Sequence, residues 1–342
     1  MSIVVDAEAF LQSRSLPIVD VRSPGEFARG HIPSAQNVPL FDDAERAEIG
    51  TIYKQVGTEP AIARGRQLAG VKVDQLVDAV RSIVPDDELF VHCWRGGMRS
   101  EGFADLLQQH GFRPQLIRGG YKAYRHAVHA GFAEPKRIVI LSGQSGSGKT
   151  HLLKLLRDEG EQVIDLEDLA GHRGSVFGGI GLPPQPTVEH FENLLFDQWR
   201  DLDPDRPIWI EGESRSIGRV YIPAPFWDQM MAAPVVFVEV PCEQRVQFLV
   251  QEYGDLPADE LATAIGRIRK RLGGLRLAAA LEALDNNDVA MFANLALQYY
   301  DKAYSSSQGK FPRQIAVNVP MKCAGDPESI ATLRGLGNKL LR

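Results

Sequence analysis

Cys93 is the residue in this chain that is best placed for covalent chemistry. It follows an apolar run at residues 88–92 that predicts a strand, and it precedes a turn with two glycines and a predicted helix. A thiolate at a strand-to-helix turn faces backbone N–H groups and the positive end of a helix dipole, which lower its pKa and favour a bound anion. We therefore predict that Cys93, Arg95 and Arg99 form a nucleophilic loop that binds an anion.

A buried and inert thiol is the common alternative for a free cysteine. We assign that alternative to Cys242 and Cys323, because neither has turn glycines and arginines of this kind around it. Three cysteines are too few for a disulfide framework, and none stands in a C-x-x-C pair that would indicate structural zinc.

Residues 143–150 read Gly-Gln-Ser-Gly-Ser-Gly-Lys-Thr and match the pattern G-x-x-x-x-G-K-T. In this pattern the backbone amides cradle phosphates, the lysine reaches the terminal phosphate and the threonine hydroxyl can bind Mg²⁺. A predicted strand at 137–141 and a predicted helix at 149–158 flank the motif, as the pattern requires. The motif predicts a bound diphosphate without indicating what the diphosphate is attached to. The predicted phosphate-binding residues are Gly143, Ser145, Gly146, Ser147, Gly148, Lys149 and Thr150, and Thr150 is also the predicted magnesium ligand.

An acidic residue at the end of a neighbouring buried strand commonly helps to hold the magnesium in such sites. Glu211 and Glu213 are the candidates, with Asp165 as an alternative, and solvated strand-end acids are the competing interpretation. The glycine-rich segment 171–184 predicts a mobile lid over the phosphate loop, and His172 and Arg173 are its candidate substrate contacts. A plain surface loop is the alternative for this segment.

Positive charge is concentrated within a predicted helix at 258–283. The chain as a whole is acidic, with 38 Lys and Arg against 44 Asp and Glu and a net charge of −6, so this local concentration stands out. Its functional interpretation is contact with the phosphates of RNA, and a solvated helix face is the alternative. The predicted RNA-binding residues are Arg267, Arg269, Lys270 and Arg271, continued by Arg276.

Length and composition indicate two globular domains. The 342 residues correspond to about two domains at roughly 150 residues each. Hydrophobic residues make up 44% and charged residues 24%, which excludes wholesale disorder. No apolar run approaches the roughly 20 residues of a membrane span, and no secretory signal pattern is present. We therefore expect a cytoplasmic protein without a membrane segment.

Short β-type runs alternate with helical patterns, which is typical of an α/β fold. A boundary is predicted between residues 126 and 136. Residues 41–58 are interpreted as a loop with a short helix. The predicted strands are 17–21, 88–92, 114–117, 137–141, 162–166, 207–211, 235–240 and 314–319. The predicted helices are 6–12, 62–83 with a break near Gly70, 99–110, 149–158, 188–200, 242–253, 258–283 and 288–304.

The N-terminal part resembles a rhodanese domain over about residues 4–125. The motifs that carry this resemblance are Ile18-Val-Asp-Val-Arg22, Glu26-Phe, Gly30-His-Ile-Pro33, Ala35, Asn37-Val-Pro39, Cys93 and Arg118-Gly-Gly120. The resemblance implies that Cys93 carries a transferable sulfur or selenium atom, and that Asp20 and Arg22 are structural. The segment from Cys93 to Arg99 is one residue longer than in typical sulfurtransferases of this fold. That length resembles the loop of cysteine phosphatases and suits a larger or tetrahedral anion.

The whole chain resembles the bacterial tRNA 2-selenouridine synthase family. Two features carry this resemblance: a phosphate loop follows a rhodanese-like domain, and segments 171–179 and 213–218 are also present. The predicted fold is α/β, with an N-terminal rhodanese-like domain at 1–130 and then a P-loop NTPase-like α/β domain with a helical C-terminal region at 136–342. The family resemblance implies a transferase that replaces sulfur by selenium in wobble 2-thiouridine of lysine, glutamate and glutamine tRNAs. It implies S-geranylation from geranyl diphosphate, with Mg²⁺ and Lys149 at the diphosphate, then selenation from selenophosphate through selenium bound to Cys93.

Two other functions stay open at this point. One is a nucleotide-dependent kinase or phosphatase fusion, in which the Cys-x5-Arg loop hydrolyses a phosphate ester. A general acid beside the loop would favour it, and the sequence identifies none. The other is a non-catalytic, nucleotide-gated RNA-binding protein, which would keep its function after Cys93→Ala.

Overall fold

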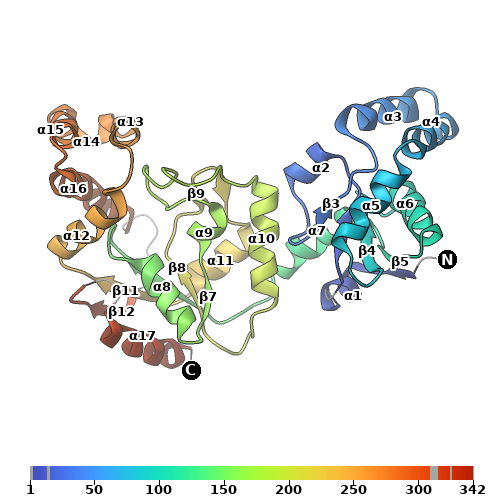
Figure 1. Cartoon of the computed structure of the whole chain (residues 1–342). Coiled ribbons are helices and arrows are strands. Elements are labelled where there is room, and N and C mark those ends of the chain that lie inside the picture. The colour runs from blue at the N-terminus through green and yellow to red at the C-terminus, as the bar shows by residue number, and fades with distance from the viewer. Residues whose placement is uncertain (1–2, 14–15, 309–314, 324–325, 342) are drawn as a thin grey trace. The chain divides into compact units, whose positions relative to one another are not determined.

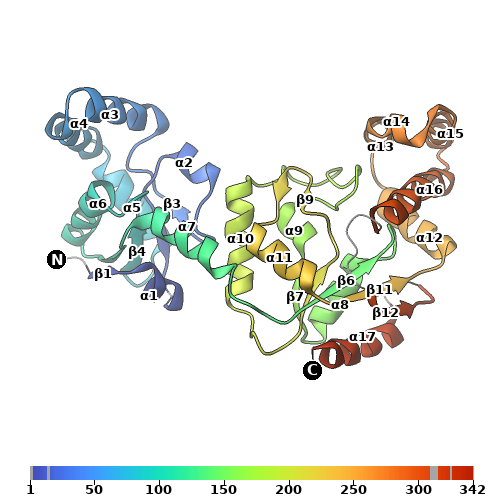
Figure 2. The ribbon, with the colours of Figure 1, turned by 180° about the vertical axis from the view of Figure 1, so that it is seen from behind.

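The computed structural model describes residues 3–13, 16–308, 315–323 and 326–341. The chain divides into two compact units, Met1–Gly131 and Phe132–Arg342, which Figures 1 and 2 show from opposite sides. Each unit contains a five-stranded sheet whose neighbouring strands run parallel. Parallel neighbours need crossover connections, which the helices between the strands provide.

The first sheet has the strand order β1-β5-β4-β2-β3. Its strands are β1 (Ile3–Val5), β2 (Ile18–Asp20), β3 (Gln36–Asn37), β4 (Glu88–His92) and β5 (Arg113–Ile117). Its helices are α1 (Ala7–Gln12), α2 (Pro24–Arg29), α3 (Asp43–Gln55), α4 (Thr58–Gly70), α5 (Val73–Ile83), α6 (Met98–Gln109) and α7 (Gly120–Gly131). The central strand β4 is buried from Leu89 to His92, as expected for a parallel strand covered on both faces. Cys93 stands directly at its carboxyl end.

The interpretation of residues 41–58 as a loop with a short helix is wrong. The structure has the 13-residue helix α3 there, followed by α4. Asp42 accepts a hydrogen bond from the Glu45 N–H at 2.8 Å, and the Glu45 side chain accepts one from the Asp42 N–H at 3.0 Å, which forms a capping box. No α3 residue is fully buried, so the apolar periodicity that reveals a helix is weak. The predicted break near Gly70 is confirmed, because α4 ends at that residue.

The second sheet has the order β12-β11-β6-β8-β7, and β9 and β10 form a separate antiparallel pair. The strands are β6 (Ile138–Gly143), β7 (Gln162–Ile164), β8 (Ile208–Glu211), β9 (Ser216–Ile217), β10 (Val220–Tyr221), β11 (Val235–Glu239) and β12 (Ile315–Pro320). The helices are α8 (Lys149–Asp158), α9 (Leu166–Ala170), α10 (Val188–Arg200), α11 (Ala224–Ala232), α12 (Cys242–Tyr253), α13 (Ala258–Arg267), α14 (Arg269–Leu272), α15 (Gly274–Asp285), α16 (Val289–Gln308) and α17 (Pro327–Leu340). The predicted last strand began at residue 314, which lies outside the described residues.

Several groups of buried residues hold this unit together, including one in which Trp199 of α10 packs against Phe226 of α11. Leu152 of α8 and Leu333 of α17 share one core with Trp209 and the other buried residues on one face of the sheet, whereas α11 lies on the opposite face (Figures 1 and 2). Helices α12 to α16 have a core of their own, which includes Leu261 and Phe292. The unit is therefore a sheet domain joined to a helical part.

The single helix predicted at 258–283 is wrong. The structure divides this segment into α13, α14 and the start of α15. Ile268 separates the first two helices, and Gly273, with a φ of +89°, separates the last two. A positive φ is a conformation that glycine adopts readily and that ends a helix. None of the helices over the described residues combines the length and the apolar character that crossing a membrane requires.

Candidate active site

The Cys93 loop lies on the backbone of the Arg118-Gly-Gly120 motif. The Tyr121 N–H donates to the Cys93 carbonyl oxygen at 2.9 Å. Gly96 and Gly120 have φ values of +63° and +58°, and a side chain at Gly120 would collide with the Cys93 carbonyl oxygen. Both glycines are therefore required by the left-handed backbone and by the close approach of the two segments.

The Cys93 thiol is 4% exposed and lies at the amino end of α6. Its Sγ is 3.3 Å from Ser100 Oγ and 3.9 Å from the Gly97 carbonyl oxygen. Burial by itself raises the pKa of the thiol. The Ser100 hydroxyl, the Arg99 charge and hydrogen bonds with the loop backbone outweigh burial, so the pKa of Cys93 is below its ordinary value. A lowered pKa increases the thiolate fraction at neutral pH, as a nucleophile requires.

The two predicted arginines differ in their surroundings. Arg99 forms a two-pronged ion pair with Glu26 of α2, with Nη1–Oε2 and Nη2–Oε1 distances of 2.6 and 3.2 Å. Arg46 Nε also lies 3.5 Å from Glu26 Oε2. Arg95 is exposed, and over the described residues no ion pair of its side chain is found. Arg95 and the loop amides are thus the groups left to meet an incoming anion, and the pairing of Arg99 with Glu26 was not predicted.

Glu26 is not suited to act as the general acid that phosphatase chemistry requires. Burial raises its pKa, but the hydrogen bonds from Arg99, the charges of Arg99 and Arg46 and a hydrogen bond from the Ser23 backbone together lower it below the ordinary value. A carboxyl group with a lowered pKa is ionised at neutral pH and has no proton to give to a leaving group. Glu26 therefore gives no support to the alternative in which this loop hydrolyses a phosphate ester.

Asp20 and Arg22 form a buried ion pair, as the rhodanese resemblance implies. Arg22 Nη2 donates to Asp20 Oδ2 at 2.6 Å and to the Gly30 carbonyl oxygen at 2.8 Å. The Arg22 guanidinium carbon lies 3.8 Å from the centre of the Tyr121 ring. The Tyr121 N–H also donates to the Cys93 carbonyl oxygen. The Asp20–Arg22 ion pair therefore stabilises the Cys93 loop through Tyr121, and we assign it a structural role.

Replacing Ser100 by alanine is expected to raise the pKa of the Cys93 thiol. The substitution removes the hydroxyl 3.3 Å from Sγ, so the thiolate loses a stabilising hydrogen bond. Alkylation by iodoacetamide should be slower in Ser100→Ala at pH 7 and should reach the wild-type rate at high pH, where both thiols are ionised. Ser82→Ala is the matched control, because Ser82 is exposed and its hydroxyl donates to the Ala79 carbonyl oxygen of its own helix at 2.7 Å. Identical pH profiles for Ser100→Ala and wild type would contradict the assignment.

The phosphate loop connects β6 to α8 in the second unit. Gly146 and Gly148 have φ values of +77° and +71°, which lets the loop curl its amides inward. Lys149 Nζ donates to the Gly143 carbonyl oxygen at 3.2 Å, a contact that it can exchange for a phosphate oxygen. Of the predicted phosphate-binding residues, those that line the adjoining cavity are Gly143, Ser145, Gly146, Gly148, Lys149 and Thr150. Ser147 does not line it, because its side chain is 1% exposed.

The acidic residues around this loop are arranged differently from the prediction. Glu211 is fully buried and accepts a hydrogen bond from the Glu167 N–H, and it does not line the cavity. Asp165 caps α9 by accepting from the Asp168 N–H at 2.9 Å. Glu213 does line the cavity, together with Glu167. Glu167 was missed, although its place just after β7 was a usable signal.

Glu167 connects the acidic residues to the phosphate loop. The Thr150 hydroxyl donates to Glu167 Oε2 at 3.1 Å. Burial and then the charge of Glu213 raise the pKa of Glu167 to about 8. Burial, followed by the charges of Glu167 and Asp165, raises the pKa of Glu211 well above its ordinary value. Several carboxyl groups therefore lie close together at this site, and in the absence of a cation their mutual repulsion and burial favour the protonated, neutral form of Glu167 and Glu211.

A Mg²⁺ ion fits this donor set. The Thr150 hydroxyl and the carboxylates of Glu167 and Glu213 are hard oxygen donors, and their crowding is relieved by a divalent cation. In the described part of the chain, no group of three or more His, Cys, Asp or Glu side chains is arranged to hold a metal ion. The remaining ligands would have to be diphosphate oxygens and water, which is usual for Mg²⁺ in phosphate sites.

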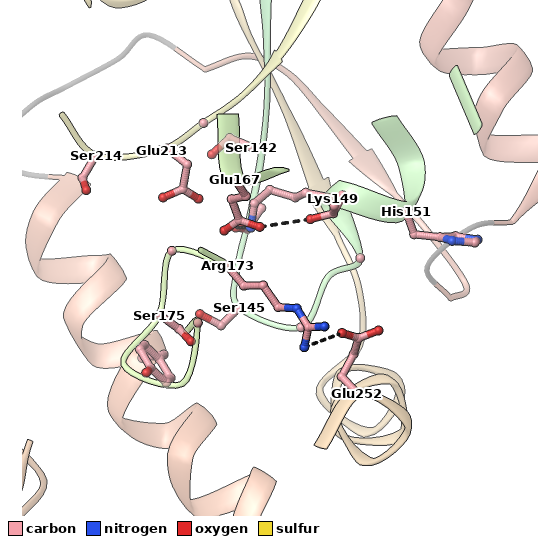
Figure 3. A pocket seen from close by; sticks show the side chains of 18 of the residues that line it. Ser142, Ser145, Lys149, His151, Glu167, Arg173, Ser175, Glu213, Ser214 and Glu252 are labelled. Atoms are coloured by element: carbon pink, nitrogen blue, oxygen red, sulfur yellow. Dashed lines mark hydrogen bonds and ion pairs between the residues drawn. The ribbon is translucent and has the colours of Figure 1, made fainter. Parts of the chain in front are cut away.

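The cavity beside the phosphate loop has a volume of about 1110 Å³, and Figure 3 shows it from close by. Its polar end contains the phosphate loop and the two carboxylates described above. Its apolar wall was not predicted, because its residues come from segment 171–184, from α11, α12 and α16, and from the first residues of β11 and β12. The apolar residues that line it are Phe177, Trp227, Met231, Val235, Phe248, Leu249, Tyr253, Tyr300 and Ile315.

The segment predicted as a lid is anchored to the helical part. Phe177 is 2% exposed, and its ring centre lies 5.3 Å from that of Tyr253 and 5.5 Å from that of Phe292. Arg173, one of the two candidate substrate contacts, lines the cavity. The other candidate, His172, does not line it, because its ring packs against Gly178.

Arg245 of α12 supports the phosphate loop and was also missed. Its Nη1 donates to the Ser145 carbonyl oxygen at 3.2 Å. Both of its Nη atoms lie 2.9 Å from carboxylate oxygens of Asp301 on α16. The helical part therefore holds the phosphate loop in place through one buried guanidinium.

The predicted RNA-binding residues are exposed but do not share one helix. Arg267 ends α13, and the other three lie on α14. Ile268 and Leu272, which alternate with them, are buried in the core of the helical part. Packing therefore turns the basic side chains outward, and none of them lines the cavity.

Comparison with known proteins agrees with this architecture. The profile of the rhodanese-like domain matches residues 4–127, and that of the tRNA 2-selenouridine synthase AAA domain matches residues 136–326. The tRNA 2-selenouridine synthase of Shewanella denitrificans is 38% identical over 334 residues, covering 87% of this chain and 89% of that protein. That of Nitrosomonas eutropha is 32% identical over 343 residues, covering 85% and 88%. The crystal structure of an N-terminal domain from Clostridium difficile 630 matches 36% of this chain and 98% of that chain, with 37% identity and a TM-score of 0.34.

These findings define the protein as an enzyme with a rhodanese-like domain and a P-loop-like α/β domain whose C-terminal part is helical. Within that class, the AAA-domain match and the relatives above identify the family. The chain belongs to the tRNA 2-selenouridine synthase family.

Proposed function

We propose that this enzyme works in the cytoplasm and replaces the sulfur of 2-thiouridine by selenium at the wobble position of lysine, glutamate and glutamine tRNAs. The relatives are named for synthesis of 2-selenouridine in tRNA. The observation that carries the chemical part of the proposal is a phosphate loop that opens into a cavity of about 1110 Å³ with an apolar wall. Such a cavity suits a diphosphate that carries a hydrocarbon chain, and geranyl diphosphate is that kind of molecule.

The first step of the proposal is S-geranylation at the phosphate loop. The sulfur of 2-thiouridine attacks the terminal carbon of the geranyl group, the carbon–oxygen bond breaks, and its electron pair leaves with diphosphate. The proton on N3 of the base passes to water, so the alkylated base is neutral. Lys149 and the loop amides stabilise the charge on the departing diphosphate. Bound Mg²⁺, held by Thr150, Glu167 and Glu213, would add positive charge at the same oxygens.

The second step is selenation through Cys93. Alkylation makes C2 of the base electrophilic and makes geranylthiol a leaving group. The Cys93 thiolate attacks the selenium of selenophosphate, the phosphorus–selenium bond breaks, and its electron pair leaves with phosphorus as phosphite. The terminal selenium of the resulting Cys93 Sγ–Se⁻ group then attacks C2, and the bond from C2 to the geranylated sulfur breaks, so geranylthiolate leaves. Two molecules of a small thiol then reduce the sulfur–selenium bond and leave as their disulfide, so selenium stays on the nucleoside and the Cys93 thiolate is restored. Selenophosphate is a tetrahedral anion, and Arg95 with the loop amides is available to bind it.

Reconstitution with purified components tests the two steps. The wild-type chain is incubated with 2-thiouridine tRNA and Mg²⁺, and the nucleosides are analysed by mass spectrometry. Geranyl diphosphate alone should yield S-geranyl-2-thiouridine, and later addition of selenophosphate and a thiol should yield 2-selenouridine and free geranylthiol. ATP or GTP in place of geranyl diphosphate should yield neither product. Formation of 2-selenouridine at full rate without geranyl diphosphate would contradict the alkylation step.

Removing the positive charge of Arg267, Arg269, Lys270 and Arg271 should weaken tRNA binding. The slope of log affinity against log salt becomes shallower by about 0.7 to 0.9 for each phosphate that is no longer neutralised. Changing these four residues to glutamine should therefore flatten the salt dependence and lower affinity at low salt. The control changes four dispersed, exposed residues, Lys54, Arg66, Lys322 and Lys339. Equal slopes for the two variants would assign the basic run to a solvated surface.

A further inference from the structure

Arg173 lines the phosphate-binding cavity, but its guanidinium forms an ion pair with Glu252 and not with a residue of the phosphate loop. It lines the same cavity as Ser145 and Lys149. Its Nη1 lies 3.4 Å from Glu252 Oε2 on α12, and the two side chains are 42% and 39% exposed. Figure 3 shows the guanidinium directed to Glu252. An ion pair this exposed adds little to stability, so a stronger anion can replace one partner.

The backbone that carries Arg173 is fixed, so the exchange needs only side-chain rotation. The Arg173 N–H donates to the Gly178 carbonyl oxygen at 2.9 Å. The Val176 N–H donates to the Tyr300 hydroxyl at 3.1 Å, and Phe177 is buried among aromatic rings of the helical part. A guanidinium on a fixed segment loses little freedom when it binds, which favours its use at a ligand.

The cavity needs a second cation when a diphosphate occupies it. Lys149 supplies one positive charge at the phosphate loop. The charge of a Mg²⁺ ion held by Glu167 and Glu213, which line the same cavity, would be offset by their two carboxylates. A guanidinium presents two parallel N–H donors that match two phosphate oxygens, which the single ammonium of a lysine does not do. Among the residues of segment 171–184, Arg173 is the one that brings such a group to the cavity.

We propose that Arg173 is a catalytic residue that exchanges Glu252 for the diphosphate of the donor substrate and stabilises the charge on the departing diphosphate. Glu252 is then a positioning residue that holds the guanidinium before the ligand binds and competes with that ligand. This inference rests on the proposed function only in taking the ligand to be a diphosphate. It extends the anion site beyond the phosphate loop to a residue of segment 171–184.

Binding of inorganic pyrophosphate in the presence of Mg²⁺ tests the exchange on the full chain by calorimetry. Arg173→Gln should bind pyrophosphate at least tenfold more weakly than wild type. Glu252→Gln should bind it several-fold more tightly, because the competing carboxylate is gone. In the double variant this gain should vanish, so that its affinity equals that of Arg173→Gln. The matched control is Arg215→Gln, which removes another exposed arginine that lines the cavity, and its affinity should change less than twofold.

Three results would overturn the inference. One is an equal gain from Glu252→Gln in the presence and absence of Arg173, because Glu252 would then act on the ligand directly. Another is an equal loss for Arg173→Gln and Arg215→Gln, which would indicate only general attraction. The third is tight binding to Arg173→Gln. Failure of wild type to bind pyrophosphate would instead contradict the diphosphate site itself, so the two failures are distinguishable.

Discussion

Cys93→Ser protein is expected to geranylate 2-thiouridine in tRNA and to make no 2-selenouridine. Serine nearly preserves the shape of the side chain, but its hydroxyl has a far higher pKa and forms no sulfur–selenium bond. The alkyl transfer needs no thiol, so S-geranyl-2-thiouridine should accumulate. Selenation should fall by at least about 10³-fold, as is typical when a nucleophile is removed. Nucleoside mass spectrometry after incubation with geranyl diphosphate, selenophosphate and a thiol measures both products.

The other two cysteines provide the control for this experiment. The prediction that Cys242 and Cys323 are buried is wrong, because both are exposed. Serine at either position should leave both nucleoside products at wild-type levels. Normal 2-selenouridine from Cys93→Ser would refute the covalent role of the thiol. Loss of S-geranyl-2-thiouridine in the same variant would refute the separation of alkylation from selenium transfer.

Lys149→Ala protein is expected to fail at the first step. The substitution removes the ammonium that stabilises the departing diphosphate, and groups of this kind contribute about 10² to 10³ in rate. Without S-geranyl-2-thiouridine the second step has no substrate, so 2-selenouridine should be lost as well. The measurement is the initial rate of S-geranyl-2-thiouridine formation, followed by mass spectrometry.

Two further measurements make the Lys149 result specific. Lys154→Ala removes another exposed ammonium of α8 that lines the cavity, and it should change the rate far less. Lys149→Ala supplied with tRNA that is already S-geranylated should form 2-selenouridine at the wild-type rate. A wild-type rate of geranylation by Lys149→Ala would show that the phosphate loop has another function.

The sequence alone predicted the backbone of the two loops because each is a continuous stretch of chain. Residues 143–150 and 93–99 each encode a strand end, a glycine turn and a helix start. The left-handed φ values of Gly96, Gly146 and Gly148 follow from those residue types. Contiguous backbone makes an anion-binding loop, so its residue types suffice to predict it. The alternation of β-type and helical patterns likewise predicted the α/β class.

Only the tertiary structure decided which distant side chains complete these loops. Arg99 meets Glu26 73 positions away in the sequence, and Thr150 meets Glu167, because the strand order of each sheet brings their connections together. Arg245 reaches the phosphate loop from 100 positions away. Local patterns contain no information on these distances, since strand order is set by packing of the whole unit.

The basic residues at 267–271 and Arg276 also show what the sequence predicts and what only the tertiary structure decides. Their composition was visible in the sequence, but Ile268 divides residues 267–271 between α13 and α14, and Gly273 separates them from Arg276 on α15. The helix periodicity of a sequence does not reveal such breaks when apolar and basic residues alternate closely. The sequence thus specified what chemistry is available, and packing decided which groups face one another.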